Sequence, residues 1–266
     1  MIMQFSLSGK KANAIFKTLT ISLSKSVMIE QTDKKLLFSD GSMLYGEYDR
    51  EYFDEYTADS YDRIKIKRIL FSSLFKAKYS KKVDQYQIHF PFDEWLKQGH
   101  YGIHIKEFVS NDLKGNHVRN VDVPEIHIEK PFFFKDQVPV FKSTNIPLTT
   151  CLTADKKELK ILPYERRCQG IYFRVDTKYL WLDCQDTSRA ISVNFKKNPQ
   201  TFSNLYNPRL LGIIPKFETH PTIYTAPGGP LLCINNFPDY RVAVIIPAII
   251  EEQKARKRNR KRISPG

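Results

Sequence analysis

The sequence predicts an α+β fold in which antiparallel sheets carry few helices. Short stretches of alternating polar and apolar residues recur along the chain, separated by Gly, Pro, Asn and Asp, whereas few segments have helical periodicity. With 266 residues and 41% hydrophobic side chains, the chain can build one large core or two ordinary ones. The elements predicted for the first half follow the order strand, helix, several strands, helix, several strands. Further strands are predicted after residue 141. We therefore expect two domains of similar architecture.

The first helix is predicted directly after Gly9. Its apolar positions at 12, 15, 16, 19 and 23 fall within an arc of about 100° on a helical wheel, with Ile21 as an exception on the polar side. The opposite half of the wheel carries four lysines, Lys10, Lys11, Lys17 and Lys25. One face is therefore suited to a core and the other to an anion.

Strands follow this helix, and a second helix is predicted at 68–79. The first-half strands are expected at 27–30, 35–39, 42–48, 63–67, 83–90, 101–109 and 117–123, with a turn at 111–116. In 124–141, three prolines surround Phe132, Phe133 and Phe134, which predicts an extended connector. The three phenylalanines could plug a groove or dock a partner; packing onto the connector's own sheet is the alternative.

The second half is predicted to contain six strands, at 170–175, 179–183, 190–195, 221–226, 231–235 and 241–246. A tight reversal lies at Pro227–Pro230, a short helix at 209–214 ends before Pro215, and a further helix is expected within 147–162. The predicted divisions are an N-terminal domain at 1–123, a connector at 124–141, a C-terminal domain at 142–250 and a basic tail at 251–266.

The formal net charge of +13 is concentrated in separate segments. Residues 61–82 carry a net +7 and include Lys67, Arg68, Lys76 and Lys78, whereas 40–60 is acidic. Basic segments brought together by folding would form an electropositive surface for a polyanion; ordinary solvated helix faces are the alternative.

The C-terminal sixteen residues carry a net +5. Their seven basic side chains are Lys254, Arg256, Lys257, Arg258, Arg260, Lys261 and Arg262. Such a run is typical of nuclear import or non-specific nucleic-acid contact, and a merely solubilising tail is the alternative.

The sequence contains no recognisable catalytic motif, so we expect a non-catalytic protein without cofactor or metal. His100 and His104 could share one face of a strand, but no further ligand is spaced to join them. The acidic band at 40–62 could hold divalent ions as nuclease carboxylates do, although it lacks a nuclease spacing.

The four cysteines and the hydropathy pattern bear on the compartment. No Cys-x-x-Cys pair is present, so we expect small core hydrophobes in a reduced intracellular compartment and neither a zinc module nor a disulfide framework. No apolar run reaches about 18 residues, so we expect no membrane span, and the N-terminus lacks the pattern of a secretory signal.

Several stretches carry a resemblance to a known family. Residues 12–24, ANAIFKTLTISLS, look like the first helix of the DNA sliding clamps, and 27–38, VMIEQTDKKLLF, like the strand-turn-strand that follows. Residues 52–56 and 63–76 are similar to the next parts of that pattern, and 222–232, TIYTAPGGPLL, is the most specific match. The chain thus resembles PCNA-like clamps, most of all the Rad-nine subunit of the heterotrimeric DNA-damage checkpoint clamp, over 1–123 and 205–250.

This resemblance implies two tandem clamp domains with antiparallel sheets outside and helices on a concave basic face. The residues facing DNA would be Lys10, Lys11, Lys17, Lys25, Lys67, Arg68, Lys76 and Lys78. Phe132–Phe134 would border the groove that binds partner peptides. The implied partners are encircled double-stranded DNA, two other clamp-like subunits, a clamp loader, and checkpoint signalling and repair proteins, all in the nucleus.

Three alternatives remain open at this point. The first is a homotrimeric replication clamp. The second is a metal-dependent exonuclease that uses Asp49 or Asp54; such an activity has been ascribed within the Rad-nine family. The third is a basic nucleic-acid-binding scaffold that forms no ring.

Overall fold

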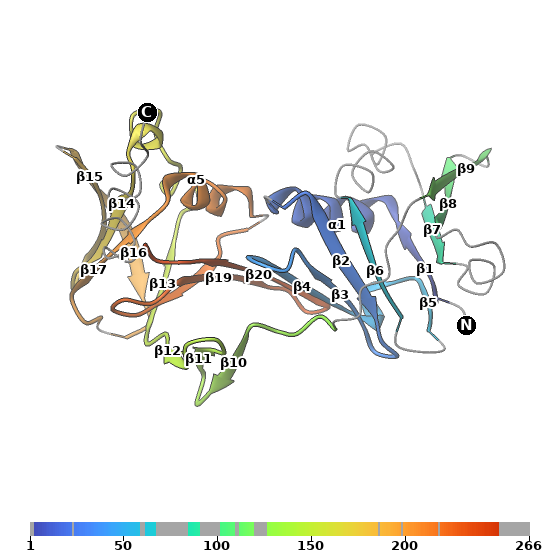
Figure 1. Ribbon diagram of the computed structural model, residues 1–266, viewed down its shortest axis with the longest axis horizontal. Coiled ribbons are helices and arrows are strands. Elements are labelled where there is room, and N and C mark those ends of the chain that lie inside the picture. The colour runs from blue at the N-terminus through green and yellow to red at the C-terminus, as the bar shows by residue number, and fades with distance from the viewer. Residues whose placement is uncertain are drawn as a thin grey trace, which may run out of the picture. The chain divides into compact units, whose positions relative to one another are not determined.

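The computed structural model describes residues 3–22, 24–58, 62–67, 85–90, 102–109, 112–119, 127–185, 187–197, 199–217 and 219–249, with strands β6 to β9 given by backbone and register. Two compact units make up the chain (Figure 1). Unit 1 comprises Met1–Lys130 and Asn235–Ala243, and unit 2 comprises Pro131–Ile234 and Val244–Gly266.

Unit 1 is built from two antiparallel sheets and the helix α1. Its elements are β1 (Met3–Ser8), α1 (Gly9–Ile21), β2 (Ser26–Gln31), β3 (Lys35–Ser39), β4 (Leu44–Asp49), η1 (Arg50–Tyr52), β5 (Glu55–Ala58), β6 (Asp62–Lys67), β7 (Gln85–Phe90), β8 (Gly102–Val109) and β9 (Asp112–Arg119). One sheet has the order β5-β1-β7-β8-β9, and β6-β2-β3-β4 form the other. The beginning of β20 (Tyr240–Ile246) lies beside β4.

Unit 2 repeats this arrangement. Its elements are β10 (Phe132–Lys135), β11 (Val138–Phe141), β12 (Ile146–Pro147), β13 (Thr150–Ala154), η2 (Glu165–Arg167), β14 (Ile171–Val175), β15 (Tyr179–Cys184), β16 (Thr187–Phe195), β17 (Phe202–Tyr206), α5 (Pro208–Leu211), η3 (Ile214–Lys216), β18 (Thr222–Thr225), β19 (Leu231–Asn236) and β20. The order β17-β14-β15-β16 is followed by β13-β18-β19-β20, and β10-β11-β12 form a small separate sheet.

The strand orders of the two units correspond. In unit 1, β1 leads into β7-β8-β9, as β13 leads into β18-β19-β20 in unit 2. Likewise β6-β2-β3-β4 corresponds to β17-β14-β15-β16. The predicted α+β class with two domains of similar architecture is therefore confirmed by the topology.

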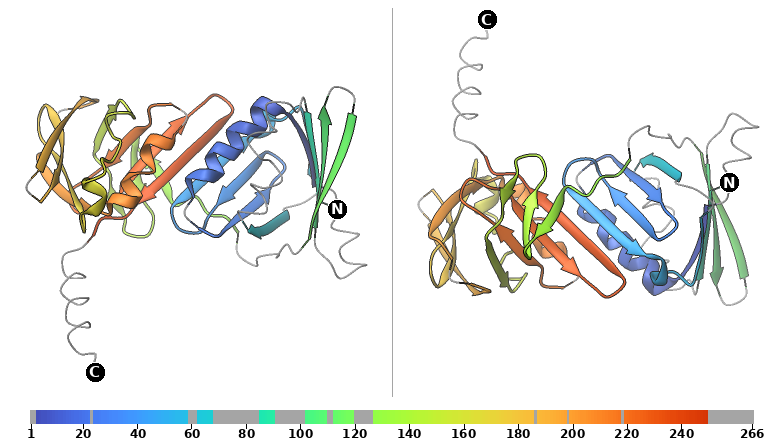
Figure 2. Two further views of the ribbon diagram at one scale, coloured as in Figure 1. Left: turned by 90° about the horizontal axis from the view of Figure 1, so that it is seen from above. Right: turned by 90° about the horizontal axis from the view of Figure 1, so that it is seen from below.

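The core of each unit consists of the inward residues of alternating strands. In unit 1, Phe5, Leu36, Phe38 and Tyr48 are buried, and Tyr48 packs edge-on against Phe38 at 5.5 Å between ring centroids. Figure 2 shows α1 crossing the strands of its unit. Ile21, which the wheel placed on the polar side, is buried at the end of α1.

Four local expectations are wrong. No helix lies within 147–162: Thr150–Ala154 is strand and the residues after it form turns, because Pro163 and the turn at Asp155 interrupt helical pairing. The short helix at Pro208–Leu211 ends earlier than predicted, and a 3-10 turn that includes Pro215 follows.

The other two wrong expectations are the turn at 111–116 and the extended connector at 124–141. Residues 112–116 belong to β9, where they pair with Ile105–Val109 of β8. Residues 132–141 are not a single extended connector but a hairpin, because Asp136 and Gln137 adopt positive φ angles and reverse the chain.

The expectation that all four cysteines are reduced is also wrong. Cys168 and Cys184 form a disulfide. Cys168 follows η2 and Cys184 ends β15, so pairing of β14 with β15 brings them together although they are sixteen residues apart. Cys151 and Cys233 are free, and burial raises the pKa of the Cys233 thiol.

Candidate nucleic-acid interface

The helix α1 separates apolar and basic side chains as the sequence predicts. Ser8 caps its N-terminus by accepting a hydrogen bond from the Lys11 amide at 3.4 Å. Ala12, Ile15 and Leu19 are buried on one side of the helix. Thr18 is also buried, and its hydroxyl lies 2.8 Å from that of Tyr48, which fixes the rotation of the helix on the sheet.

The four lysines predicted on this helix do not share one environment. Lys10, Lys17 and Lys25 are exposed, with Lys25 in the turn after the helix. Lys11 instead forms an ion pair with Asp54 at 2.8 Å and lies 5.7 Å from the centre of the Tyr52 ring. Lys11 therefore ties α1 to the segment after η1, and its charge is compensated within the unit.

Most of the other predicted basic residues lie outside the described part of the chain. This applies to Arg68, Lys76, Lys78 and the seven basic residues of the tail. Lys67 is placed by register at the end of β6, opposite Ser26 of β2. Their contribution to an interface stays a prediction.

Four of the acidic residues of 40–55, Asp40, Glu47, Asp49 and Asp54, have protein partners. Asp40 accepts hydrogen bonds from the amides of Ser42, Met43 and Leu44 at 2.7–3.0 Å. Asp49 pairs with Lys35 at 3.1 Å, and Asp54 pairs with Lys11. Among the residues whose side chains are described, no three His, Cys, Asp or Glu side chains gather to hold a metal ion.

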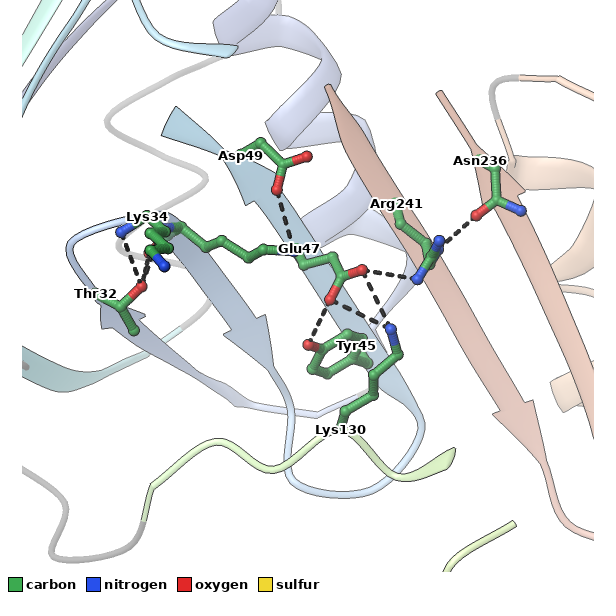
Figure 3. Close-up of polar contacts among 9 residues, drawn as sticks. Thr32, Lys34, Tyr45, Glu47, Asp49, Lys130, Asn236 and Arg241 are labelled. Carbon is green, nitrogen blue, oxygen red and sulfur yellow. Dashed lines mark hydrogen bonds and ion pairs between the residues drawn. The ribbon is translucent and has the colours of Figure 1, made fainter. Parts of the chain in front are cut away.

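Glu47 of β4 is the centre of a larger network, drawn in Figure 3. Its carboxylate accepts hydrogen bonds from the Tyr45 hydroxyl at 2.9 Å, from Lys130 at 3.2 Å and from Arg241 at 2.9 Å. Arg241 also donates to the Asn236 side chain at 2.5 Å. The network thus joins β4, the residues before β10 and the tip of the β19–β20 hairpin, Asn235–Ala243, all within unit 1.

The charges of this network shift the pKa of its members. Burial alone would raise the pKa of Glu47, but Lys130, the Tyr45 hydroxyl, Lys35 and Arg241 together lower it below its ordinary value. The pKa of Lys130 is lowered, because burial and the like charges of Arg241 and Lys35 together outweigh the opposing effect of Glu47. Burial next to Glu47 raises the pKa of Tyr45. At neutral pH, Glu47 is therefore the common anion of two cations.

A second carboxylate holds the same stretch of chain. Glu30 of β2 is buried and accepts a hydrogen bond from the amide of Ile128 at 2.6 Å. His127 lies 2.9 Å from its other oxygen. Glu30 and Glu47 together fix residues 127–130 on the sheet directly before β10.

The three phenylalanines of β10 differ in exposure. Phe132 is fully buried, whereas 42% of Phe133 and 39% of Phe134 are exposed. Phe134 contacts the ring of Phe132 at 5.8 Å and that of Tyr224 at 6.3 Å between centroids. Phe132 is therefore a core residue, and Phe133 and Phe134 are the two with exposed ring surface.

Unit 2 has a basic surface that the sequence did not predict. The exposed cations of 155–167 are Lys157, Lys160, Arg166 and Arg167, and Arg209 and Lys216 on α5 and η3 are also exposed. The turn η2 contacts α5, and Lys156 donates to the Phe217 carbonyl at 2.8 Å, so these segments adjoin. We name the six exposed cations the unit 2 basic surface. Spacing alone could not reveal it, because the segment has no regular period.

Three tethers hold the irregular segment under this surface. Arg189 of β16 pairs with the buried Glu165 at 3.0 Å. The same guanidinium donates to the carbonyls of Glu158 and Lys160. The disulfide at Cys168 anchors the end of the segment to β15. Tertiary contacts therefore replace the helix that follows β1 in unit 1.

Comparison with solved structures identifies the fold. The chain is similar to PCNA from Thermococcus kodakaraensis at 14% identity and a TM-score of 0.64, over 93% of this chain and 100% of that one. It is similar to proliferating cellular nuclear antigen from Entamoeba histolytica at 10% identity and a TM-score of 0.70, over 93% and 99%.

Two complexes give the same result. One is A. fulgidus PCNA with the C-terminal region of FEN-1 bound, at 12% identity and a TM-score of 0.63, over 93% of this chain and 98% of that one. The other is the PCNA2–PCNA3 complex from Sulfolobus tokodaii, at 14% identity and a TM-score of 0.66, over 92% and 99%. No protein-family model and no curated protein sequence matches the chain.

These likenesses confirm the predicted fold class: the chain has the PCNA fold. Among the described residues, no helix has the length and apolar character needed to cross a membrane.

Proposed function

We propose that this chain is a subunit of a ring that encircles double-stranded DNA, with α1 facing the duplex. The exposure of Lys10 and Lys17 opposite the buried Ala12, Ile15 and Leu19 is the observation that carries this proposal. Lysines on a rigid helix contact phosphates without reading bases, so the ring holds DNA and still slides.

The unit 2 basic surface is a second DNA contact in the proposal. Its side chains come from turns and the short α5, yet they are positioned by the Glu165–Arg189 pair and by the disulfide. A fixed array of cations is sufficient for phosphate contact, because this interaction requires no particular secondary structure. In this proposal the domains are 1–123 and 142–250, joined by the connector 124–141.

The finer assignment is a non-catalytic subunit of a heterotrimeric checkpoint clamp of the Rad-nine type, acting in DNA-damage signalling in the nucleus. The 222–232 hairpin supports this resemblance. Its turn is held by Asn204, which donates to the Ala226 carbonyl at 2.8 Å and accepts from the Gly228 amide at 2.8 Å. Gly228 has a φ of +67°, which other residues adopt only with strain.

The partners in this proposal are two other clamp-like subunits, a clamp loader, and signalling and repair proteins. The PCNA2–PCNA3 complex is an assembly of different clamp chains, and A. fulgidus PCNA binds a FEN-1 segment. For this chain, Phe133 and Phe134 are the proposed contacts for such a peptide, and the basic tail is the proposed nuclear import signal.

Retention of the assembled ring on DNA tests the central claim. Rings that contain the Lys10→Glu, Lys17→Glu double variant should slide off the ends of linear DNA at lower salt than the wild type, because repulsion replaces phosphate contacts. Lys34→Glu, an exposed lysine in the β2–β3 turn, is the matched control. Equal retention of all three rings would overturn the assignment of α1 to the DNA.

Native mass distinguishes the ring types. A chain that is monomeric alone and trimeric only with other clamp-like subunits supports the checkpoint proposal. A stable homotrimer formed by this chain alone would favour the replication clamp.

A further inference from the structure

In unit 2, the neighbouring strands β14 and β15 have one face in the core and one face toward solvent. The residues at 171, 173 and 175 of β14 and at 180, 182 and 184 of β15 are buried. The residues that alternate with them lie on the other face of the sheet. We name this surface the outer face of β14–β15; its residues are Tyr172, Arg174, Tyr179, Trp181 and Asp183.

Three aromatic rings follow one another along the outer face of β14–β15. Tyr172 is 40% exposed and Tyr179 is 43% exposed, which is unusual for side chains of this size. Trp181 lies 6.0 Å from Tyr179 between ring centroids, and in register it is opposite Arg174, two residues after Tyr172. Tyr179 is beside Asp176, so the row from Tyr172 to Tyr179 spans about four residues of strand, or about 13 Å.

The polar groups of this face hold the rings in place. The Arg174 guanidinium lies 4.9 Å from the centre of the Trp181 ring and donates to Asp183 at 2.7 Å. The Trp181 indole N–H donates to Asp176 at 2.6 Å, and Asp176 also accepts hydrogen bonds from the amides of Lys178 and Tyr179 at 2.7 Å. Both carboxylates therefore have protein donors, and the aromatic row is positioned before any partner binds.

Exposed lysines lie at the Tyr179 end of the row. Lys178 is in the β14–β15 turn, and Lys196 and Lys197 follow β16. Because β15 and β16 are antiparallel, the turn before β15 and the loop after β16 lie at the same end of the sheet. The outer face of β14–β15 thus combines exposed rings with cations at one end.

We propose that the outer face of β14–β15 binds a single strand of nucleic acid. Its bases stack on Tyr172 and Tyr179, and its phosphates lie near the lysines at the end of the row. Every base has a flat π face, so aromatic rings beside cations bind single strands with little dependence on sequence, and sheets that carry aromatic residues on an outer face serve this purpose in RNA-binding domains.

The chemistry of the face favours this ligand over two others. In a duplex the bases are stacked on one another and present only their edges in the grooves, so they cannot stack on protein rings. A proline-rich peptide also docks on aromatic side chains, but it has no phosphates to match Lys178, Lys196 and Lys197.

This site is separate from the unit 2 basic surface. Cys184 follows Asp183 in β15, is buried, and anchors the segment that carries the unit 2 basic surface through its disulfide with Cys168. Successive residues of a strand face opposite sides, so that segment is anchored from the face opposite to the aromatic row. The proposal therefore does not depend on the contact of a ring with duplex DNA.

Fluorescence anisotropy with the full chain tests the site. The probes are a labelled oligothymidine of about 12 nucleotides and an abasic strand of the same length, which keeps the phosphates but has no bases. The wild type should bind oligothymidine more tightly than the abasic strand. The Tyr172→Ala, Tyr179→Ala double variant should bind oligothymidine at least about fivefold more weakly, with little change for the abasic strand, and each single variant should show part of the loss.

Two controls separate stacking from other effects. Tyr164→Ala removes a tyrosine that is 44% exposed but lies outside this face, and it should bind like the wild type. Tyr172→Phe with Tyr179→Phe keeps both rings and should also bind like the wild type. Far-UV circular dichroism verifies that each variant is folded.

Three results would overturn the proposal. The first is equal binding of oligothymidine and the abasic strand by the wild type. The second is undiminished oligothymidine binding by the folded alanine variants. The third is binding of a proline-rich peptide that is lost in these variants while oligothymidine binding is unchanged, which would assign the face to a protein partner.

Discussion

Glu47 and Arg241 form an ion pair at 2.9 Å although 194 residues separate them in the sequence. The Glu47 side chain is 11% exposed and also accepts hydrogen bonds from Tyr45 and Lys130. Its carboxylate therefore holds three separate stretches of chain within unit 1.

Replacing this carboxylate should destabilise unit 1. In Glu47→Gln the positive charges of Lys130 and Arg241 lose their common anion, which should cost about 2–4 kcal/mol of unfolding free energy. Urea unfolding measures the loss. Asp49→Asn is the control, because its pair with Lys35 is exposed and should contribute no more than about 0.5 kcal/mol. Equal losses for the two variants would contradict the central role of Glu47.

The same carboxylate predicts a dependence of stability on pH. The folded-state pKa of Glu47 is lowered, so its stabilising contribution is fully present above the ordinary carboxyl value of about 4.3 and is lost as the pH falls through the folded pKa. The unfolding free energy of the wild type should fall more steeply between neutral pH and about pH 3 than that of Glu47→Gln. Parallel profiles would show that other carboxylates account for the acid sensitivity.

The disulfide should contribute measurably to unit 2. Closing a loop of this size stabilises a protein by about 3 kcal/mol in the loop-entropy description, so reductant should lower the stability of the wild type by that order. The Cys168→Ala, Cys184→Ala double variant should be less stable and insensitive to reductant. Alkylation mapped by mass spectrometry should modify Cys151 before reduction but Cys168 and Cys184 only afterwards. Alkylation of Cys168 without reduction would contradict the pairing.

Asn204 should be essential for the turn after β18. It is buried and bonds to Ala226, Gly228 and the Tyr206 hydroxyl, so Asn204→Ala leaves several polar groups without partners and should cost about 2–3 kcal/mol. Burial raises the pKa of Tyr206 to about 12, so its hydroxyl stays protonated in ordinary buffers. Asn194→Ala, at an exposed position of β16, should unfold like the wild type in the same urea titration.

The unit 2 basic surface should strengthen DNA binding, although only Arg209 of its six cations lies on an α-helix. Charge reversal at Lys157, Lys160 and Arg166 should weaken DNA retention by the assembled ring and reduce the salt dependence of binding, because fewer phosphates are contacted. Lys178→Glu in the β14–β15 turn is a control at an exposed position outside this surface. A response no larger than that of the control would restrict the interface to unit 1.

The spacing of apolar residues predicted the helix and the strands whose buried face is set by residues of the same segment. The first helix was predicted because Ala12, Ile15 and Leu19 repeat at helical spacing, and most strands because alternate residues face the core. Segment 155–168 was not predicted correctly, because Arg189 and Cys184, which hold it, come from distant strands.

The candidate sites show the same division. The basic face of α1 follows from one segment and was predicted, although the capture of Lys11 by Asp54 was not. The unit 2 basic surface depends on contacts of its segment with Arg189 and with the Cys168–Cys184 disulfide, which no spacing within one segment encodes.

The β19–β20 hairpin also determines when unit 1 can be completed during synthesis. Tyr240 stacks on Tyr48 with ring centroids 5.0 Å apart, and Asn235–Ala243 belong to unit 1 although Pro131–Ile234 of unit 2 precede them in the chain. On a ribosome, the N-terminal unit must therefore wait for the last strand to emerge. Until then the sheet edge at β4 has no β20 to pair with, and an unpaired edge of this kind makes a nascent chain prone to aggregation.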